Sequence, residues 1–193
     1  MKTITRVYDN YSQAQKVVND LEASGISADH ISIIANKHVS KEYSDAEPAS
    51  GAASGAGLGA VVGGGAGLLA GLGLLAIPGL GPVVAAGWLA ATALGAAGGA
   101  AAGGIIGLLV GTGVSEDDAH VYSEAIRRGG TMVTVRYDDQ DQMAVNRILN
   151  TQSPIDPSKR RTEYQAVGWT KFDPNAPDYN LSDAEIENRR RQG

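Results

Sequence analysis

Cysteine is absent from this chain of 193 residues, which excludes a disulfide framework and thiolate chemistry. Only one Phe and two Trp are present, so aromatic stacking is limited as a means of binding. The formal net charge of −5 is spread along the chain and gives no general nucleic-acid signal. The first residues lack the apolar core of a signal peptide, and we therefore expect no cleaved export sequence.

The longest absence is one of charge. Residues 48–115 contain no Asp, Glu, Lys, Arg or His, and we call them the uncharged segment. The flanks, residues 1–47 and 116–150, are ordinary mixed polar sequence. Residues 151–193 contain scattered prolines and few aliphatic side chains. The sequence therefore predicts a discontinuous domain built from the two flanks, an insertion, and an extended tail.

Glycine recurs every four residues inside the uncharged segment, in two ladders. The first ladder is Gly51, Gly55, Gly59, Gly63, Gly67 and Gly71; the second is Gly87, Gly95, Gly99, Gly103, Gly107 and Gly111, with Ala91 filling its register. On a helix this step leaves a groove without side chains, where another backbone can approach closely. We therefore predict helix packing along both ladders, within the chain and between copies.

A turn divides the uncharged segment. Ile77 is followed by Pro78, Gly79, Leu80, Gly81 and Pro82, a combination that stops helices. The stretches on either side, about 53–77 and 83–114, are long enough to cross a hydrocarbon layer, which needs about 20 residues. The pattern predicts an antiparallel helical hairpin, with its turn at 77–82, that returns the chain to the same domain.

The first flank predicts a strand, a helix and a strand. Residues 4–8 are β-prone, Ser12 and Gln15 have the spacing of a capping box, and residues 31–35 alternate as a strand does. After the uncharged segment, Ser115 and Asp118 predict a helix start.

The second flank then continues with a strand over 131–137 and a helix over 139–150. The two flanks together predict an α+β fold, a small βαβ-αβα sandwich of about three strands related to the ferredoxin-like arrangement. The helical hairpin interrupts it, and the tail follows.

Catalytic, cofactor and metal motifs are not visible in the sequence. The glycine-rich region has no lysine for a phosphate loop, and the clustered acids near helix starts are explained by capping. The histidines lack metal-ligand spacing; they are His30, His38 and His120. We therefore predict no enzyme, no cofactor, no metal and no small-molecule substrate.

Three aromatic residues stand out in the tail, in a chain that has few. Trp169, Phe172 and Tyr179 are expected to dock onto the domain or onto another subunit. The basic runs at 159–161 and 189–191 are expected to be solvated or to bind a partner rather than lipid. Ser182 and Glu185 predict a short helix near the end.

Several motifs resemble bacterial general stress proteins of the heat- or low-temperature-induced type, over residues 3–150. They are Tyr8-Asp9-Asn10, the stretch 76–82, the helix start at 115–119 and the strand region 127–136. The tail around Gly168-Trp169, Phe172-Asp173, Ala176-Pro177 and Tyr179 is similar to a tail in the same stress-associated group. The resemblance implies stress-induced expression and a non-enzymatic role, and it brings no catalytic residues.

Three functions remain open from the sequence. The first is a membrane-embedded homo-oligomer at the bacterial inner membrane, assembled by its glycine ladders, with lipid as a partner and its α/β domain on the cytoplasmic side. The second is a soluble, cytoplasmic self-assembling structural protein in which copies bury each other's hairpins. The third is a regulatory module that binds a small ligand in its α/β domain. No nucleic-acid partner is expected.

Overall fold

The computed structural model describes residues 1–36, 73–77, 80–89, 100–176 and 179. The strands are β1 (Lys2–Tyr8), β2 (Ile31–Asn36), β3 (Gly73–Ile77), β4 (Gly81–Gly87) and β5 (Thr131–Tyr137). The helices are α1 (Tyr11–Ala23), α5 (Ala100–Gly111), α6 (Glu116–Arg127), α7 (Gln142–Leu149) and α8 (Pro157–Ala166), with short 3₁₀ turns η1 (Ala28–His30) and η2 (Asp139–Asp141). The fold is therefore α+β, as predicted.

The sheet of the described residues has five strands in the order β1-β5-β2-β4-β3, and every neighbouring pair is antiparallel. The prediction of about three strands is wrong, because the uncharged segment contributes β3 and β4. The predicted ferredoxin-like arrangement is not confirmed, since β5 lies inside the sheet between β1 and β2.

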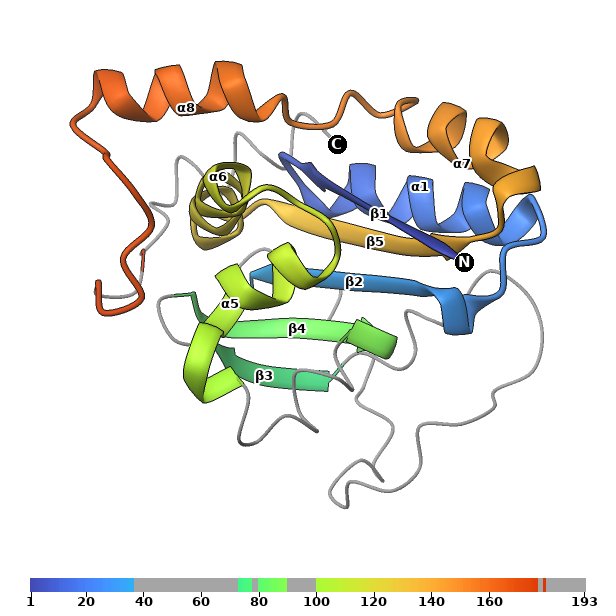
Figure 1. Cartoon of the computed structure of the whole chain (residues 1–193), viewed down its shortest axis with the longest axis horizontal. Helices are drawn as coiled ribbons and strands as arrows, with labels where there is room; N and C mark the ends of the chain where they lie inside the picture. Colours follow the sequence, from blue (N-terminus) through green and yellow to red (C-terminus); the bar gives the residue numbers. More distant parts are fainter. Residues whose placement is uncertain (37–72, 78–79, 90–99, 177–178, 180–193) are drawn as a thin grey trace.

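Helices cover both faces of this sheet (Figure 1). On one face, α1 and α7 pack over a core that includes Val17 of α1, Ile33 of β2 and Val133 of β5. On the other face, α5 and α6 pack over a core that includes Ile34 and Met132. Neighbouring residues Ile33 and Ile34 enter different cores because successive side chains of a strand point to opposite faces.

The flanks form their elements for the reasons that the sequence indicates. Ser115 caps α6, and its side chain accepts a hydrogen bond from the backbone of Asp118, as predicted. The strand predicted over 131–137 is β5. Helix α1 begins earlier than predicted, because the side chain of Asn10, rather than that of Ser12, caps it by accepting from Gln13 N.

The predicted helical hairpin is wrong next to its turn. Residues 73–77 and 81–87 are strands that pair with each other, so the chain reverses as a β-hairpin. The physical reason is burial on both sides: Val83 and Ala85 face one core and Ala86 faces the other. A short apolar run bounded by turn residues is equally typical of such a fully buried strand. Residues 53–72 of the predicted first helix, 53–77, lie outside the described residues.

Of the predicted second helix, 83–114, residues 83–87 lie in β4 and Ala100–Gly111 form α5, while residues 90–99 lie outside the described residues. The tail is also less extended than predicted. Helix α8 begins at Pro157 because Asp156 accepts hydrogen bonds from Ser158 N and Lys159 N, and proline fits the first helical turn. The terminal helix predicted at Ser182 lies outside the described residues.

Candidate functional site

The glycines of the two predicted ladders fall into three groups in the structure. Gly103, Gly107 and Gly111 lie in α5. Gly87 ends β4. The remaining ladder glycines, Gly51, Gly55, Gly59, Gly63, Gly67, Gly71, Gly95 and Gly99, lie outside the described residues.

Gly87 is needed for a reason other than helix packing. Its φ is +89°, a conformation that side chains disfavour, and a Cβ there would lie 2.8 Å from Ser32 Cα and closer still to Ile31 O. The close approach lets the Ser32 hydroxyl accept a hydrogen bond from Leu89 N at 2.9 Å. The interpretation of Gly87 as a helical ladder position is therefore wrong.

The ladder positions on α5 face open space. A Cβ added to Gly107 or Gly111 would meet nothing within 4 Å, and both residues are exposed. Val110, which shares their side of the helix, is 44% exposed. Gly104 interrupts the helix with φ 52° and ψ −150°, so the face is regular only from Ile105 onward. It is an apolar strip on the surface, and we call Gly107, Val110 and Gly111 the glycine face.

The opposite side of α5 is firmly held. Ile105 and Leu109 are buried against the sheet. The Thr112 hydroxyl donates to Leu109 O at 2.7 Å, so the Thr5 hydroxyl must donate to Thr112 at 3.1 Å. Thr134 in turn donates to Thr5 at 2.9 Å, because each hydroxyl has one proton. This buried chain of hydroxyls fixes the end of α5 to β1 and β5, and so fixes the direction of the glycine face.

The predicted turn lies between β3 and β4. Leu80 N donates to Ile77 O at 3.0 Å, as in a β-turn. Gly81 and Pro82 are the first residues of β4. Pro78 and Gly79 lie outside the described residues.

The predicted tail aromatics lie against α6 and its neighbours. Phe172 is 2% exposed and belongs to the core on the α5–α6 face. Trp169 packs edge-on against Tyr164 of α8, with the ring centres 5.5 Å apart. The Tyr179 ring lies 5.5 Å from the guanidinium of Arg128. The tail therefore contacts its own domain.

A buried carboxylate organises the surface that the tail contacts. Glu124 is 1% exposed; its Oε1 lies 3.0 Å from Arg127 Nη2 and 2.6 Å from Arg128 Nε, and its Oε2 accepts from Arg127 Nε at 3.0 Å. The guanidinium of Arg128 then lies 4.5 Å from the centre of the Tyr164 ring. Sequence reasoning missed this cluster. The available signal was the spacing of three and four residues between Glu124 and the two arginines.

The basic run at 159–161 binds the domain rather than solvent alone. Arg160 Nη2 lies 2.7 Å from Asp9 Oδ1, and Arg161 Nη2 lies 3.0 Å from Asp118 Oδ1. Asp9 follows β1, and Asp118 lies in the first turn of α6. These two pairs therefore link α8 to the end of β1 and to the start of α6.

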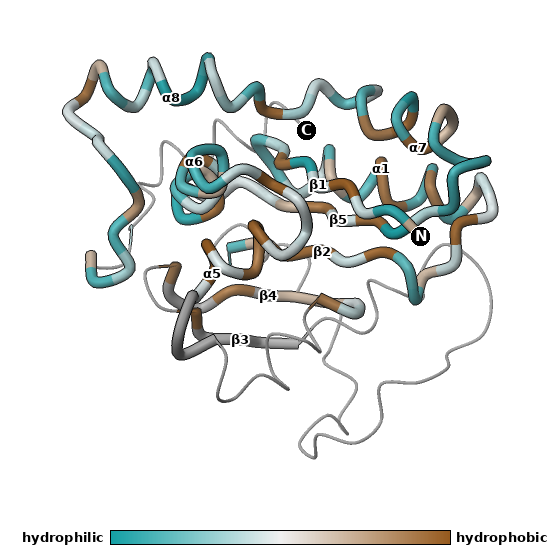
Figure 2. Tube along the Cα trace, in the orientation of Figure 1, coloured by the Kyte–Doolittle hydropathy of each residue, from teal (hydrophilic) through white to brown (hydrophobic). Residues whose placement is uncertain are grey.

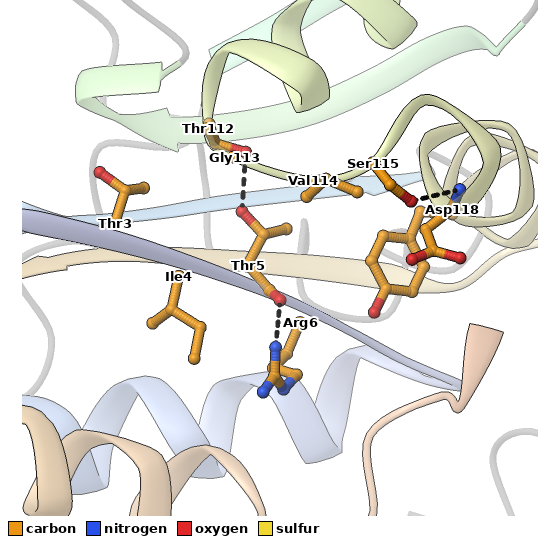
Figure 3. A pocket seen from close by; sticks show the side chains of 10 residues that line it. Thr3, Ile4, Thr5, Arg6, Thr112, Gly113, Val114, Ser115 and Asp118 are labelled. Atoms are coloured by element: carbon orange, nitrogen blue, oxygen red, sulfur yellow. Dashed lines mark hydrogen bonds between the residues drawn. The ribbon is translucent and has the colours of Figure 1, made fainter.

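A small hollow of about 210 Å³ lies between β1 and the loop from α5 to α6 (Figure 3). Half of its lining residues carry hydroxyls, Thr3, Thr5 and Ser115 among them, and Arg6 and Asp118 are its charged residues. Arg6 donates to Thr5 O at 2.9 Å, and Asp118 is paired with Arg161. Burial raises the pKa of Tyr122, which also lines the hollow. The charged groups are thus engaged within the chain.

Metal and membrane signals are both missing from the part of the chain that the structure describes. Those residues contain no group of three or more His, Cys, Asp or Glu that could hold a metal ion. His30 lies in η1 and His120 in α6, and His38 lies outside the described residues. Among the same residues, no helix combines the length and apolar character needed to span a membrane.

Residues 3–76 match the family model of the heat induced stress protein YflT domain. The match supports a general stress protein family, in agreement with the resemblance of the motifs. No curated protein and no solved structure matched the chain.

The stretch that matches the heat induced stress protein domain runs from β1 to near the end of β3. Two of the five strands of its sheet, β4 and β5, come from later residues, as do the glycine face and the tail.

Proposed function

We propose that this chain is a non-enzymatic, stress-associated protein that self-associates through its uncharged segment. The observation that carries the proposal is the glycine face. Gly107, Val110 and Gly111 form an apolar strip on a helix whose other side is buried, and open space lies over both glycines. A helix that is apolar on every side is expected to be covered.

A second backbone is the partner that this strip fits best. Glycines four residues apart leave a groove in which another helix can pack at close range. The uncharged segment of a second copy carries the same spacing, at Gly51 through Gly71 and at Gly95 and Gly99. Two copies could therefore supply each other with matching grooves and no charges to desolvate.

Lipid is the other environment that a segment without charges could occupy. Strand β2 ends at Asn36 and β3 begins at Gly73, and both belong to one sheet. Any membrane crossing between them would therefore have to start and end on the side of the bilayer where the sheet lies. Two helical crossings need about 40 residues plus a turn, which is more than residues 37–72 provide. This count favours sister copies over a two-pass anchor; the inner-membrane location remains a prediction from sequence.

The test is the double variant G107L/G111L, with N19L as its matched control. The variant fills the glycine face, whereas N19L adds the same side chain at an exposed position of α1. Sedimentation velocity without detergent should show an assembly for the wild type and for N19L, and a smaller species for G107L/G111L. A monomeric wild type, or equal sizes for all three proteins, would refute the proposal. Recovery only in alkaline-washed membranes would favour lipid instead.

A further inference from the structure

The tail is attached to the rest of the domain at separate points between Ile155 and Phe172. We call residues 155–176 the strap. At its start, Ile155 N donates to Val7 O at 2.7 Å, which ties the strap to the edge strand β1. Ile155 itself is 6% exposed and belongs to the core on the α5–α6 face. The strap thus begins and ends in the same core, since Phe172 lies there too.

The middle of the strap, α8, is attached by ion pairs at the protein surface. The ion pairs of Arg160 with Asp9 and of Arg161 with Asp118 are only partly buried, with side chains 23% to 43% exposed. Pairs of this kind contribute little and weaken with salt. Figure 2 shows α8 as mostly hydrophilic. The ion pairs of α8 therefore orient the strap but contribute little to the free energy of its attachment.

The far end of the strap is the strong attachment. Tyr164 and Phe172 are 6% and 2% exposed, and between them the chain turns at Gly168 with φ +85°. Val167, just before this turn, is 71% exposed. Trp169 packs on Tyr164 of α8, and the exposed residues Thr170 and Lys171 separate Trp169 from Phe172, so Phe172 can leave the core without moving α8.

The core that Phe172 completes contains several described residues of the uncharged segment. They come from the hairpin turn, from β4 and the residues just after it, and from α5; they are Leu80, Val83, Ala85, Leu89, Ile105 and Leu109. The same core contains residues of α6 and β5, which belong to the flanks. Phe172 is thus one of the side chains that attach the uncharged segment to the rest of the domain.

We infer that the strap regulates self-association: while Phe172 is docked, it holds β4 and α5 in the sandwich, and its release frees apolar surface of the uncharged segment for other copies. This regulation rests on the proposed function, since it requires that the uncharged segment mediate assembly. Heat favours release because undocking one aromatic side chain frees a segment of backbone and its entropy.

The experiment compares F172A with V167A in the full chain. Both variants remove apolar atoms from the strap, but Val167 is exposed and Phe172 is buried. Hydrogen exchange measured by mass spectrometry should become at least about tenfold faster in residues 80–89 and 105–114 of F172A, with α1 and β5 close to the wild type. Sedimentation at the same temperature and concentration should show a larger assembled fraction for F172A than for the wild type. V167A should match the wild type in both measurements.

A second variant, R160Q/R161Q, loosens α8 without touching the core. It should change exchange in the same residues by a smaller factor and become equal to the wild type in high salt. Unchanged exchange of residues 80–89 and 105–114 in both variants would overturn the inference. Equally faster exchange in α1 and β5 would overturn it too, because Phe172 would then support the whole fold. Faster local exchange in F172A with an unchanged size of the assembly would refute the link between the strap and assembly. A wild type that never assembles would instead refute the proposed function itself.

Discussion

The substitution Gly87→Ala separates the two structural interpretations of the uncharged segment by its sign. If Gly87 were an exposed ladder position in a helix, alanine would stabilise the protein by about 1 kcal/mol. In the strand, alanine must adopt φ near +89°, which costs about 1–3 kcal/mol. Its Cβ would also press on backbone atoms of Ile31 and Ser32, which cannot rotate away.

Relieving that contact requires β4 to move from β2, at about 1–3 kcal/mol as in overpacked cores. It also strains the hydrogen bond from Leu89 N to Ser32. The expected loss in the free energy of unfolding is therefore about 2–6 kcal/mol, or about 4–24 °C in Tm for a chain of this size.

Urea unfolding followed by circular dichroism measures this difference. The matched control is Gly107→Ala, which lies in α5 with open space and should stabilise the protein by about 1 kcal/mol. If Gly87→Ala is as stable as the wild type or more stable, the strand at this position and the five-stranded sheet are refuted.

Two further predictions concern the surface under the strap and the buried phenols. Glu124→Gln should lower the free energy of unfolding by about 3 kcal/mol, because two arginines lose their buried carboxylate, whereas Glu163→Gln at an exposed pair should change it by less than about 1 kcal/mol; urea titration checks both. Burial raises the pKa of Tyr122 and Tyr164, so the unfolded chain loses these protons first, and stability should be level below about pH 10 and fall above it. Tyr122→Phe should reduce that fall; an unchanged slope would contradict the assignment.

The flanks could be predicted because their local signals agree. In β5 the residues Val133, Val135 and Tyr137 alternate as a strand does, and all three enter the core under α1. In α6 the cap at Ser115 is a property of neighbouring residues alone. Such signals need no knowledge of distant contacts, so the elements of both flanks were predicted nearly in place.

The sheet order and the buried Glu124 cluster could not be predicted in the same way. β5 lies between β1 and β2, which join it from distant parts of the sequence. Likewise, the cluster around Glu124 includes Tyr164 of the tail, whose ring covers the guanidinium of Arg128. Spacing along one helix suggested the pairs, but only tertiary packing decides that they are buried.

The error in the uncharged segment has a more general cause. A segment that water does not reach usually lacks charges unless they are paired, whether lipid or a protein core replaces the water. In β4 this is met by Val83 and Ala86, which are buried in opposite cores. Gly107 and Gly111 do not meet it within the described residues, since open space lies over them. Composition gives both stretches the same appearance. Among the described residues only the second leaves apolar surface uncovered, so the proposed self-association is best tested on α5 rather than on the turn at 77–82.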